Sequence, residues 1–307
     1  MINRREFLEK TAALAGVSTL PAWGPLGCAT QARYPAYGNT LQDRLWMWGH
    51  DSGVYDGAKG KYNIPLSPPI SMADGIKYMG IPNVCVIRHR VGNDEYNKQF
   101  KDVKRIAWTL SMGSNQSYQS LKNYVFGLRD TMPNLTGYYL DDFFRFGDKP
   151  GFDQNSETVP APASLSLDEL KQLHDETKAY KRRLDLAIVL YTHMLCPAIK
   201  PYMKYTDTVS LWIWSGSDIQ KIEDNFKKYR SLVPDKPTLL GIYMWDFGGR
   251  KELSTEFMGK QLDYAYKLYK QGQIEGMIFH CTPLCNKNLA AVEYAKKWIA
   301  EHGGESR

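Results

Sequence analysis

The sequence has few charged residues and no long apolar stretch. Charged side chains make up 23% of the 307 residues and hydrophobic ones 43%, which excludes the highly charged, apolar-poor composition of a disordered chain. The net charge of +6 is small and is not clustered, so no basic stripe predicts nucleic-acid binding. No segment holds the roughly 20 consecutive apolar residues needed to cross a bilayer. These features indicate a globular protein.

Two chemical signatures are also missing. After the first expected strand, the segment WGHDSGVYDGAKG lacks the GxGxxG spacing of a dinucleotide-binding turn. The segment CTPLC, with Cys281 and Cys285, has no second matching pair that would complete a metal site. We therefore expect no cofactor and no metal. If the protein is exported, some of its cysteines could form disulfides.

The N-terminus has the pattern of an export signal. RREFL at residues 4–8 precedes an uncharged stretch that ends at Cys28, which is typical of a secretory signal and resembles the twin-arginine signal of bacteria. Residues 1–30 are predicted to be this signal. Cys28 is either a lipidation site that attaches the protein to a membrane or lies near an ordinary cleavage point. The remaining chain, residues 31–307, is predicted to work in the periplasm or as a membrane-anchored lipoprotein.

From residue 43 onwards, short apolar runs alternate with segments of helical periodicity. The runs are almost continuously apolar, as in strands covered on both faces of a parallel sheet, and they span residues 44–50, 83–89, 105–111, 137–142, 184–193, 208–214, 238–246 and 276–281. Ser71 before Asp74, and Ser166 before Glu169, predict helix N-caps. Eight strand–helix units predict an α/β fold that is a single (β/α)8 barrel, with an open doubly wound sheet as the alternative.

Polar and aromatic side chains collect at the carboxyl ends of the expected strands, where barrels of this kind hold their active sites. Four of the six histidines fall at these ends. Aromatic rings with a polar edge suit the faces of sugars. We therefore predict a carbohydrate-binding mouth formed by Trp48, His50, Asp51, Arg88, His89, Tyr191, His193, Trp212, Trp214, Trp245 and His280.

Some of these side chains have a structural alternative. Arg88 could neutralise a neighbouring carboxylate, and Asp51 could serve a turn, since Gly53 follows closely. Trp212 and Trp214 are two residues apart and share one face of a strand, so they could form either a sugar platform or part of the core. Arg88 also makes an acidic sugar conceivable, although it does not favour one over a neutral sugar.

The stretch GYYLDDFFRF at residues 137–146 contains the pair that is hardest to explain structurally, Asp141 and Asp142. Successive strand side chains point to opposite faces, so both carboxylates reach the mouth only where the strand bends into its loop. Because like charges repel, one of the two is expected to have a raised pKa. A protonated carboxyl beside an ionised one is what acid-assisted cleavage of a glycosidic bond requires. A helix cap or a metal site is the competing role.

The Gly-aromatic-x-Leu-Asp-Asp strand in an exported barrel resembles a glycoside hydrolase, and the adjacent pair is similar to that of the O-GlcNAcase and bacterial hyaluronidase-like family. This resemblance implies that Asp141 orients and polarises the acetamido group of the substrate and that Asp142 is the general acid. The larger clan with an acid/base on strand four and a nucleophile on strand seven offers a second mapping, in which Asp142 is the acid/base and Asp246 the nucleophile. That clan normally has Glu at both positions and Asn before the first, and this sequence has neither.

Two other classes remain open from the sequence. A metal-dependent sugar isomerase or hydrolase barrel could use His50, His193, His280 and a carboxylate, although the HxH on strand one and the Glu residues on later strands that are usual there are missing. A non-catalytic glycan-binding barrel would keep the aromatic rings and need no paired acids. We predict a hydrolase that cleaves glycosidic bonds of an oligo- or polysaccharide.

Overall fold

The computed structural model describes residues 38–55, 61–88, 91–110, 118–144, 153–157 and 163–307. The predicted signal segment, including Cys28, and the predicted site residue His89 lie outside these described residues. The chain divides into a unit Met1–Pro35 and a unit Ala36–Arg307, and the second contains every described residue.

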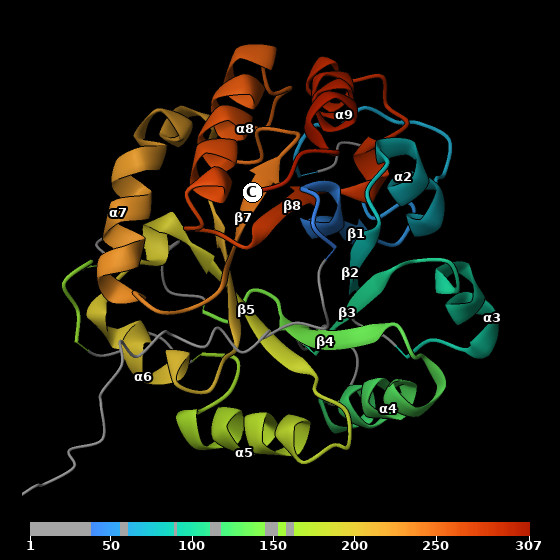
Figure 1. The fold of residues 1–307 in the computed structure, drawn as a ribbon, viewed down its shortest axis with the longest axis vertical. Coiled ribbons are helices and arrows are strands. Elements are labelled where there is room, and N and C mark those ends of the chain that lie inside the picture. Colours follow the sequence, from blue (N-terminus) through green and yellow to red (C-terminus); the bar gives the residue numbers. More distant parts are fainter. Residues whose placement is uncertain (1–37, 56–60, 89–90, 111–117, 145–152, 158–162) are drawn as a thin grey trace, which may run out of the picture. The chain divides into compact units, whose positions relative to one another are not determined.

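Eight parallel strands form a closed barrel in sequential order (Figure 1), so that β1 pairs with both β2 and β8. The strands are β1 Leu45–His50, β2 Asn83–Ile87, β3 Arg105–Thr109, β4 Leu135–Leu140, β5 Asp185–Tyr191, β6 Thr208–Trp212, β7 Thr238–Tyr243 and β8 Gly276–His280. The predicted (β/α)8 barrel is confirmed, and the open doubly wound sheet is excluded because β8 closes onto β1.

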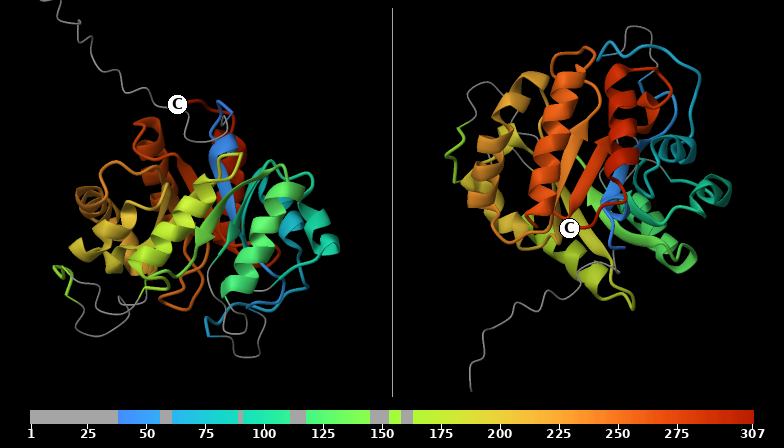
Figure 2. Two further views of the ribbon diagram at one scale, coloured as in Figure 1. Left: turned by 90° about the horizontal axis from the view of Figure 1, so that it is seen from below. Right: turned by 45° about the horizontal axis from the view of Figure 1, so that its top comes forward.

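One α-helix follows each strand and packs on the outside of the barrel (Figure 2). The helices are α2 Met72–Met79, α3 Asp94–Asn97, α4 Tyr118–Thr131, α5 Leu167–Lys178, α6 Lys200–Met203, α7 Ile222–Leu232, α8 Thr255–Lys270 and α9 Ala290–His302. Short 3-10 helices lie before β1 and in the connections: η1 Gln42–Arg44, η2 Lys98–Phe100, η3 Thr192–Met194, η4 Pro197–Ile199, η5 Gly216–Lys221 and η6 Thr282–Leu284.

The local sequence sets the helix ends. The Ser71 hydroxyl accepts a hydrogen bond from the Asp74 backbone N–H at 3.0 Å, which caps α2. Gly80 ends the same helix with a φ of 66°, a left-handed conformation that glycine adopts without steric cost. At α5, the Ser166 hydroxyl and the Glu169 carboxylate each accept from the other's backbone N–H. Both predicted caps are therefore present.

Aromatic rings from several strands fill the upper barrel interior. Trp48 of β1 lies edge-on to Tyr139 of β4 and to Trp212 of β6, with ring centroids 5.3 Å apart in both pairs. Tyr243 of β7 packs on Trp212 at 5.1 Å, and His280 of β8 packs on Tyr243 at 4.9 Å. The barrel core thus carries a layer of rings directly beneath the carboxyl ends of its strands.

A glycine makes room for the largest of these rings. A Cβ atom at Gly241 of β7 would lie only 2.1 Å from an atom of the Trp212 indole. Contacts this close between carbon atoms are strongly repulsive, since dispersion wells lie near 3.5–4.0 Å. Glycine at this position is therefore a packing requirement of the ring layer.

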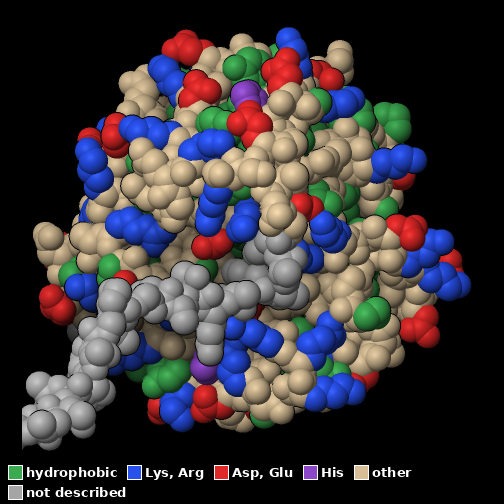
Figure 3. Space-filling view, viewed as in Figure 1, with side chains coloured by type: hydrophobic (Ala, Val, Ile, Leu, Met, Phe, Trp, Pro, Cys, Tyr) green, Lys and Arg blue, Asp and Glu red, His purple; other side chains and the backbone are tan. Residues whose placement is uncertain are grey.

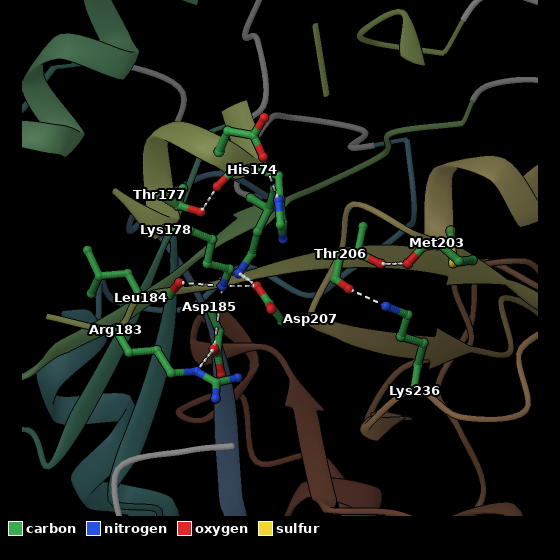
Figure 4. A network of polar contacts seen from close by, with 12 residues as sticks. His174, Thr177, Lys178, Arg183, Leu184, Asp185, Met203, Thr206, Asp207 and Lys236 are labelled. Carbon is green, nitrogen blue, oxygen red and sulfur yellow. Dashed lines mark hydrogen bonds and ion pairs between the residues drawn. The ribbon is translucent and has the colours of Figure 1, made fainter. Parts of the chain in front are cut away.

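The amino ends of β5 and β6 carry a network of ion pairs (Figure 4). The Lys178 ammonium lies 2.5 Å from Asp207 Oδ2, which also accepts from the Leu186 backbone N–H at 2.8 Å. Asp185 accepts from Arg183 Nε at 2.9 Å, and only 6% of its side chain is exposed. Burial, together with the charge of Asp207, raises the pKa of Asp185 to about 6. In such barrels this end contributes to stability rather than to catalysis.

Basic and acidic side chains are interspersed over the face of the molecule shown in Figure 3. Within the described part of the chain, no helix combines the length and the apolar character needed to cross a membrane. The four described cysteines, Cys85, Cys196, Cys281 and Cys285, are buried thiols and do not form disulfides. The disulfide pairing that an exported protein would permit is therefore not made by these residues.

Candidate active site

A pocket of about 210 Å³ lies at the carboxyl ends of the barrel strands. Aromatic side chains supply most of its wall, two histidines and two carboxylates supply its polar groups, and one aliphatic side chain completes it. The lining residues are Trp48, His50, Tyr55, Tyr62, Asp141, Asp142, Val189, Tyr191, Trp212, Trp214, Tyr243, Phe247 and His280.

Asp141 and Asp142 line this pocket because the chain turns as β4 ends. The strand stops at Leu140, so both residues lie in the turn that follows it. Asp142 has a φ of 44°, a left-handed conformation that Asp adopts more readily than most non-glycine residues. Asp141 is partly buried and Asp142 is exposed. Both carboxylates therefore reach one cavity although strand side chains alternate between faces.

Tyr191, the last residue of β5, holds the Asp142 carboxylate. Its hydroxyl donates a hydrogen bond to Asp142 Oδ1 at 2.9 Å. Burial raises the pKa of the Tyr191 phenol well above 10, and the nearby phenol of Tyr243 and the charges of Asp142 and Asp141 add to this effect. Tyr191 is therefore a protonated donor at physiological pH.

Two further phenols in the wall remain protonated for the same reason. Burial raises the pKa of Tyr243 well above its usual value, and the charge of Asp142 contributes next. Burial also raises the pKa of Tyr55, with a smaller contribution from the charge of Asp141. The pair of carboxylates thus lies among phenols that can donate hydrogen bonds but cannot supply a compensating positive charge.

His280 and His50 form the histidine side of the pocket, with ring centroids 5.5 Å apart. His280 is only 7% exposed and packs on Phe247 at 4.7 Å. Burial, and next the neighbouring His50, hold the pKa of His280 well below 6.5, so its imidazole is neutral at physiological pH. The backbone N–H of His50 donates to the Thr282 hydroxyl at 3.1 Å, which ties β1 to the loop after β8.

The two tryptophans of β6 and its following loop both line the pocket, but in different ways. Trp212 is 1% exposed, and its indole N–H donates to the Ser210 hydroxyl at 2.8 Å, so it belongs to the core and forms part of the floor. Trp214 is only partly buried and lies edge-on to Tyr191 at 5.9 Å. Trp214 is therefore the ring that a ligand can cover.

Two predicted residues after β7 lie outside the pocket lining. The strand ends at Tyr243, so Trp245 and Asp246 belong to the next loop. Trp245 is 3% exposed and its indole N–H donates to the Tyr62 backbone carbonyl at 3.1 Å. Trp245 therefore anchors the loop after β7 to the segment around Tyr62 and does not line the pocket.

Asp246 is also held by backbone groups rather than directed into the pocket. Its Oδ1 accepts from the Gly216 N–H at 2.9 Å and from the Gly249 N–H at 2.7 Å, and the residue is 5% exposed. A Cβ at either glycine would lie within 2.7 Å of the Asp246 carboxylate. Asp246 therefore joins the loops after β6 and β7 and does not line the pocket.

Arg88 and Asp51 pair with each other and do not line the pocket. Arg88 Nη1 lies 3.0 Å from Asp51 Oδ1, and the Tyr96 hydroxyl donates to the same oxygen at 2.8 Å. The guanidinium also lies 3.7 Å from the centre of the Tyr96 ring. The alternative role for Arg88, neutralising a carboxylate, is the one observed. His193 stacks on Tyr191 with ring centroids 5.4 Å apart and does not line the pocket.

Five lining residues were not predicted from the sequence. Val189 could have been found, because it lies two residues before the selected Tyr191 and on the same face of β5. Tyr243 is the last residue of β7, and the sequence places the strand end beyond it. Tyr55, Tyr62 and Phe247 come from loops, whose path no periodicity in the sequence reveals. Among the described residues, no group of three His, Cys, Asp or Glu side chains is arranged to hold a metal ion.

No protein-family model and no curated protein matches the sequence. Among solved structures, the chain is similar to catalytic-site mutants of active domain 2 of a thermostable chitinase from Pyrococcus furiosus, complexed with chito-oligosaccharides. The TM-score is 0.51 at 12% identity, and the match covers 90% of this chain and 99% of that chain. This similarity supports the barrel fold.

Two further solved structures match less well. A tamarind chitinase-like lectin has a TM-score of 0.48 at 11% identity, over 82% of this chain and 98% of that chain. A β-glucuronidase from Ruminococcus gnavus in complex with D-glucuronic acid has a TM-score of 0.46 at 10% identity, over 83% of this chain and 49% of that chain.

Proposed function

We propose that this protein is a glycoside hydrolase that protonates the leaving oxygen of a glycosidic bond with a carboxyl group at the end of β4. The observation that carries this proposal is the position of Asp141 and Asp142 on a pocket walled by aromatic rings. Aromatic faces pack against the apolar faces of sugars, and paired carboxyl groups are the chemical equipment of most glycosidases.

Asp142 is the proton donor in this proposal, and Asp141 is its ionised partner. The Asp142 carboxyl gives its proton to the glycosidic oxygen while the bond between that oxygen and the anomeric carbon breaks. Following the resemblance at GYYLDD, Asp141 polarises the acetamido group of the substrate, whose carbonyl oxygen attacks the anomeric carbon. Water then opens this intermediate and restores the proton to Asp142. The hydrogen bond from Tyr191 occupies Asp142 Oδ1, which leaves Oδ2 for the proton.

The surroundings of Asp246 favour this mapping over one with a nucleophile after β7. A nucleophilic carboxylate must contact the anomeric carbon, whereas Asp246 is buried, is absent from the pocket lining and accepts two backbone hydrogen bonds through Oδ1. The proposed chemistry therefore needs only the two carboxyl groups that follow β4.

The proposal is tested by turnover of aryl glycosides and polysaccharides by the wild-type protein and by Asp142→Asn and Asp141→Asn. We expect Asp142→Asn to lower kcat by about 10²–10⁴, because general acid catalysis contributes that much, and to leave sugar binding intact. Asp218→Asn is the matched control, since Asp218 is a surface residue of η5 paired with Lys221.

Two results would contradict the proposal. Complete loss of activity in Asp246→Asn would favour the nucleophile after β7, because Asn keeps the Oδ1 that accepts both backbone hydrogen bonds. Sugar binding by the wild-type protein without turnover of any glycoside would instead favour a non-catalytic glycan-binding barrel.

A further inference from the structure

We infer that the pocket accepts an uncharged sugar ring and rejects an anionic one, and that His280 gives this ring a hydrogen bond from the pocket floor. The inference deepens the proposed function, because it relies on that function for the kind of ligand. It concerns binding and does not depend on turnover.

The charge of the pocket disfavours an anionic ligand. Asp141 and Asp142 are its acidic groups, and no Lys or Arg side chain stands among the described residues that line it. The carboxylate of a uronic acid would bring a further negative charge into this partly enclosed space. Like charges repel strongly where water is partly excluded, and the described lining residues include no Lys or Arg to offset that repulsion.

Arg88, the cation that makes an acidic sugar conceivable from the sequence, is already paired with a carboxylate. The Arg88 guanidinium contacts both oxygens of Asp51, at 3.0 and 3.1 Å, and covers the face of Tyr96.

 

The Arg88 side chain is 11% exposed, and its charge is paired with Asp51. Arg88 is therefore not available to neutralise a uronic acid in the pocket.

His280 supplies a neutral polar group at the pocket floor. Its ring lines the pocket, while its Nδ1 is buried and makes no hydrogen bond. Because Nδ1 is shut off from the cavity, Nε2 is the ring nitrogen left for a ligand. A neutral imidazole nitrogen either donates to or accepts from a hydroxyl group, according to its tautomer. A sugar hydroxyl can serve in both roles, so it matches His280 without a change of charge.

The size of the pocket suits one sugar ring. Its volume of about 210 Å³ is below the roughly 300 Å³ at which pockets for drug-sized ligands begin. The rings of Trp214 and Phe247, 5.7 Å apart, form one wall beside His280. A single ring can therefore contact an aromatic face and the imidazole together.

The charge part of the inference is tested by calorimetric titration of the wild-type protein with methyl glycosides of a neutral hexose, an N-acetylhexosamine and a uronic acid. We expect the uronic acid to bind at least about tenfold more weakly than the neutral hexose, a difference of about 1.4 kcal/mol. Equal or tighter binding of the uronic acid would overturn the inference. Tighter binding of choline than of any neutral sugar would also overturn it, because the site would then be an aromatic cage for cations.

The His280 part is tested with two variants. His280→Met removes the hydrogen bond and should weaken neutral-sugar binding about threefold to tenfold, whereas His280→Gln keeps a polar group and should lose less. His174→Met, on α5 outside the pocket, is the matched control. Wild-type affinity in a folded His280→Met would overturn this part. If neither His280 variant folds, the wild-type comparison of neutral and anionic sugars decides the inference.

Turnover separates this inference from the proposed function. Hydrolysis of uronides that depends on Asp142 would support the hydrolase and overturn the inference. Selective binding of neutral sugars without hydrolysis would support the inference and contradict the hydrolase.

Discussion

The side chain of Tyr191 connects the carboxylate pair to the aromatic wall. Its hydroxyl donates to Asp142 Oδ1 at 2.9 Å, and its ring packs against Trp214 and His193. Because the phenol stays protonated, this hydrogen bond persists across the physiological pH range. Tyr191 is therefore a positioning residue for the proposed acid.

We expect Tyr191→Phe to lower kcat about tenfold and to leave KM nearly unchanged. The substitution keeps the ring and removes only the hydroxyl, whose hydrogen bond strengthens as the proposed acid Asp142 gives up its proton and becomes charged. A hydrogen bond to a charged group contributes about 1.5–3 kcal/mol. Steady-state kinetics on the best aryl glycoside measures the two parameters separately.

Tyr229→Phe is the matched control for this prediction. The Tyr229 hydroxyl is 2.7 Å from the Thr238 hydroxyl in the core, away from the pocket lining. Loss of the Tyr229 hydroxyl should lower the free energy of unfolding by about 1 kcal/mol without a change in kcat. A Tyr191→Phe enzyme that is less stable but has wild-type kcat would show that Tyr191 is only structural.

At the scale of elements, the sequence predicts the strands better than it predicts their ends. Strands covered on both faces are continuously apolar, so all eight were found. The apolar run that contains β7 continues past Tyr243. Tyr243 lies opposite His280 and is the last residue of β7 that pairs with β8. Trp245 and Asp246 were therefore assigned to a strand end although they lie in a loop.

The same reasoning explains which site residues could be predicted. Trp48, His50 and His280 lie within their strands, close to the last paired residues, so strand periodicity is enough to place them. Tyr55 and Phe247 reach the pocket from loops, and their positions depend on tertiary packing that a sequence pattern does not contain.

We expect Gly241→Ala in β7 to lower the free energy of unfolding by about 1–3 kcal/mol or more, because overpacking a close-packed core costs this much. The added Cβ would clash with the Trp212 indole and displace it toward the pocket. Sugar binding should weaken as well. Urea denaturation and calorimetric titration measure the two effects.

Gly127→Ala provides a control of opposite sign. Gly127 lies inside α4, and no atom approaches within 4 Å of the position that its Cβ would take. Alanine is favoured over glycine inside a helix by about 0.5–1 kcal/mol, so this variant should be more stable. Equal stability changes in the two glycine variants would show that the clash with Trp212 does not control packing.

The whole barrel separates two kinds of carboxylate. Asp141 and Asp142 lie at the carboxyl ends of the strands, beside the open pocket. Asp185 lies at the opposite ends, buried in the ion-pair network of Figure 4. In barrels of this class the first end carries function and the second carries stability, so the pH dependences of activity and of unfolding should have different origins.

This separation gives a prediction for stability against pH. Burial raises the pKa of Asp185 from its ordinary value of 3.8 to about 6, so between these values the folded state binds more protons than the unfolded state. The contribution of Asp185 to the free energy of unfolding therefore falls as pH rises from about 4 to about 6. Asp185→Asn cannot ionise and keeps an oxygen that can accept from Arg183.

The free energy of unfolding of Asp185→Asn relative to wild type should therefore increase between about pH 4 and pH 6, by up to about 3 kcal/mol. Above pH 6 the difference should become constant. Urea denaturation at several pH values measures the difference. Asp130→Asn is the control: the hydrogen bond from Tyr180 lowers the pKa of Asp130 below 3.8, so its effect changes only at lower pH. A constant difference for Asp185→Asn between pH 4 and 6 would show that the folded barrel ionises Asp185 as easily as the unfolded chain does.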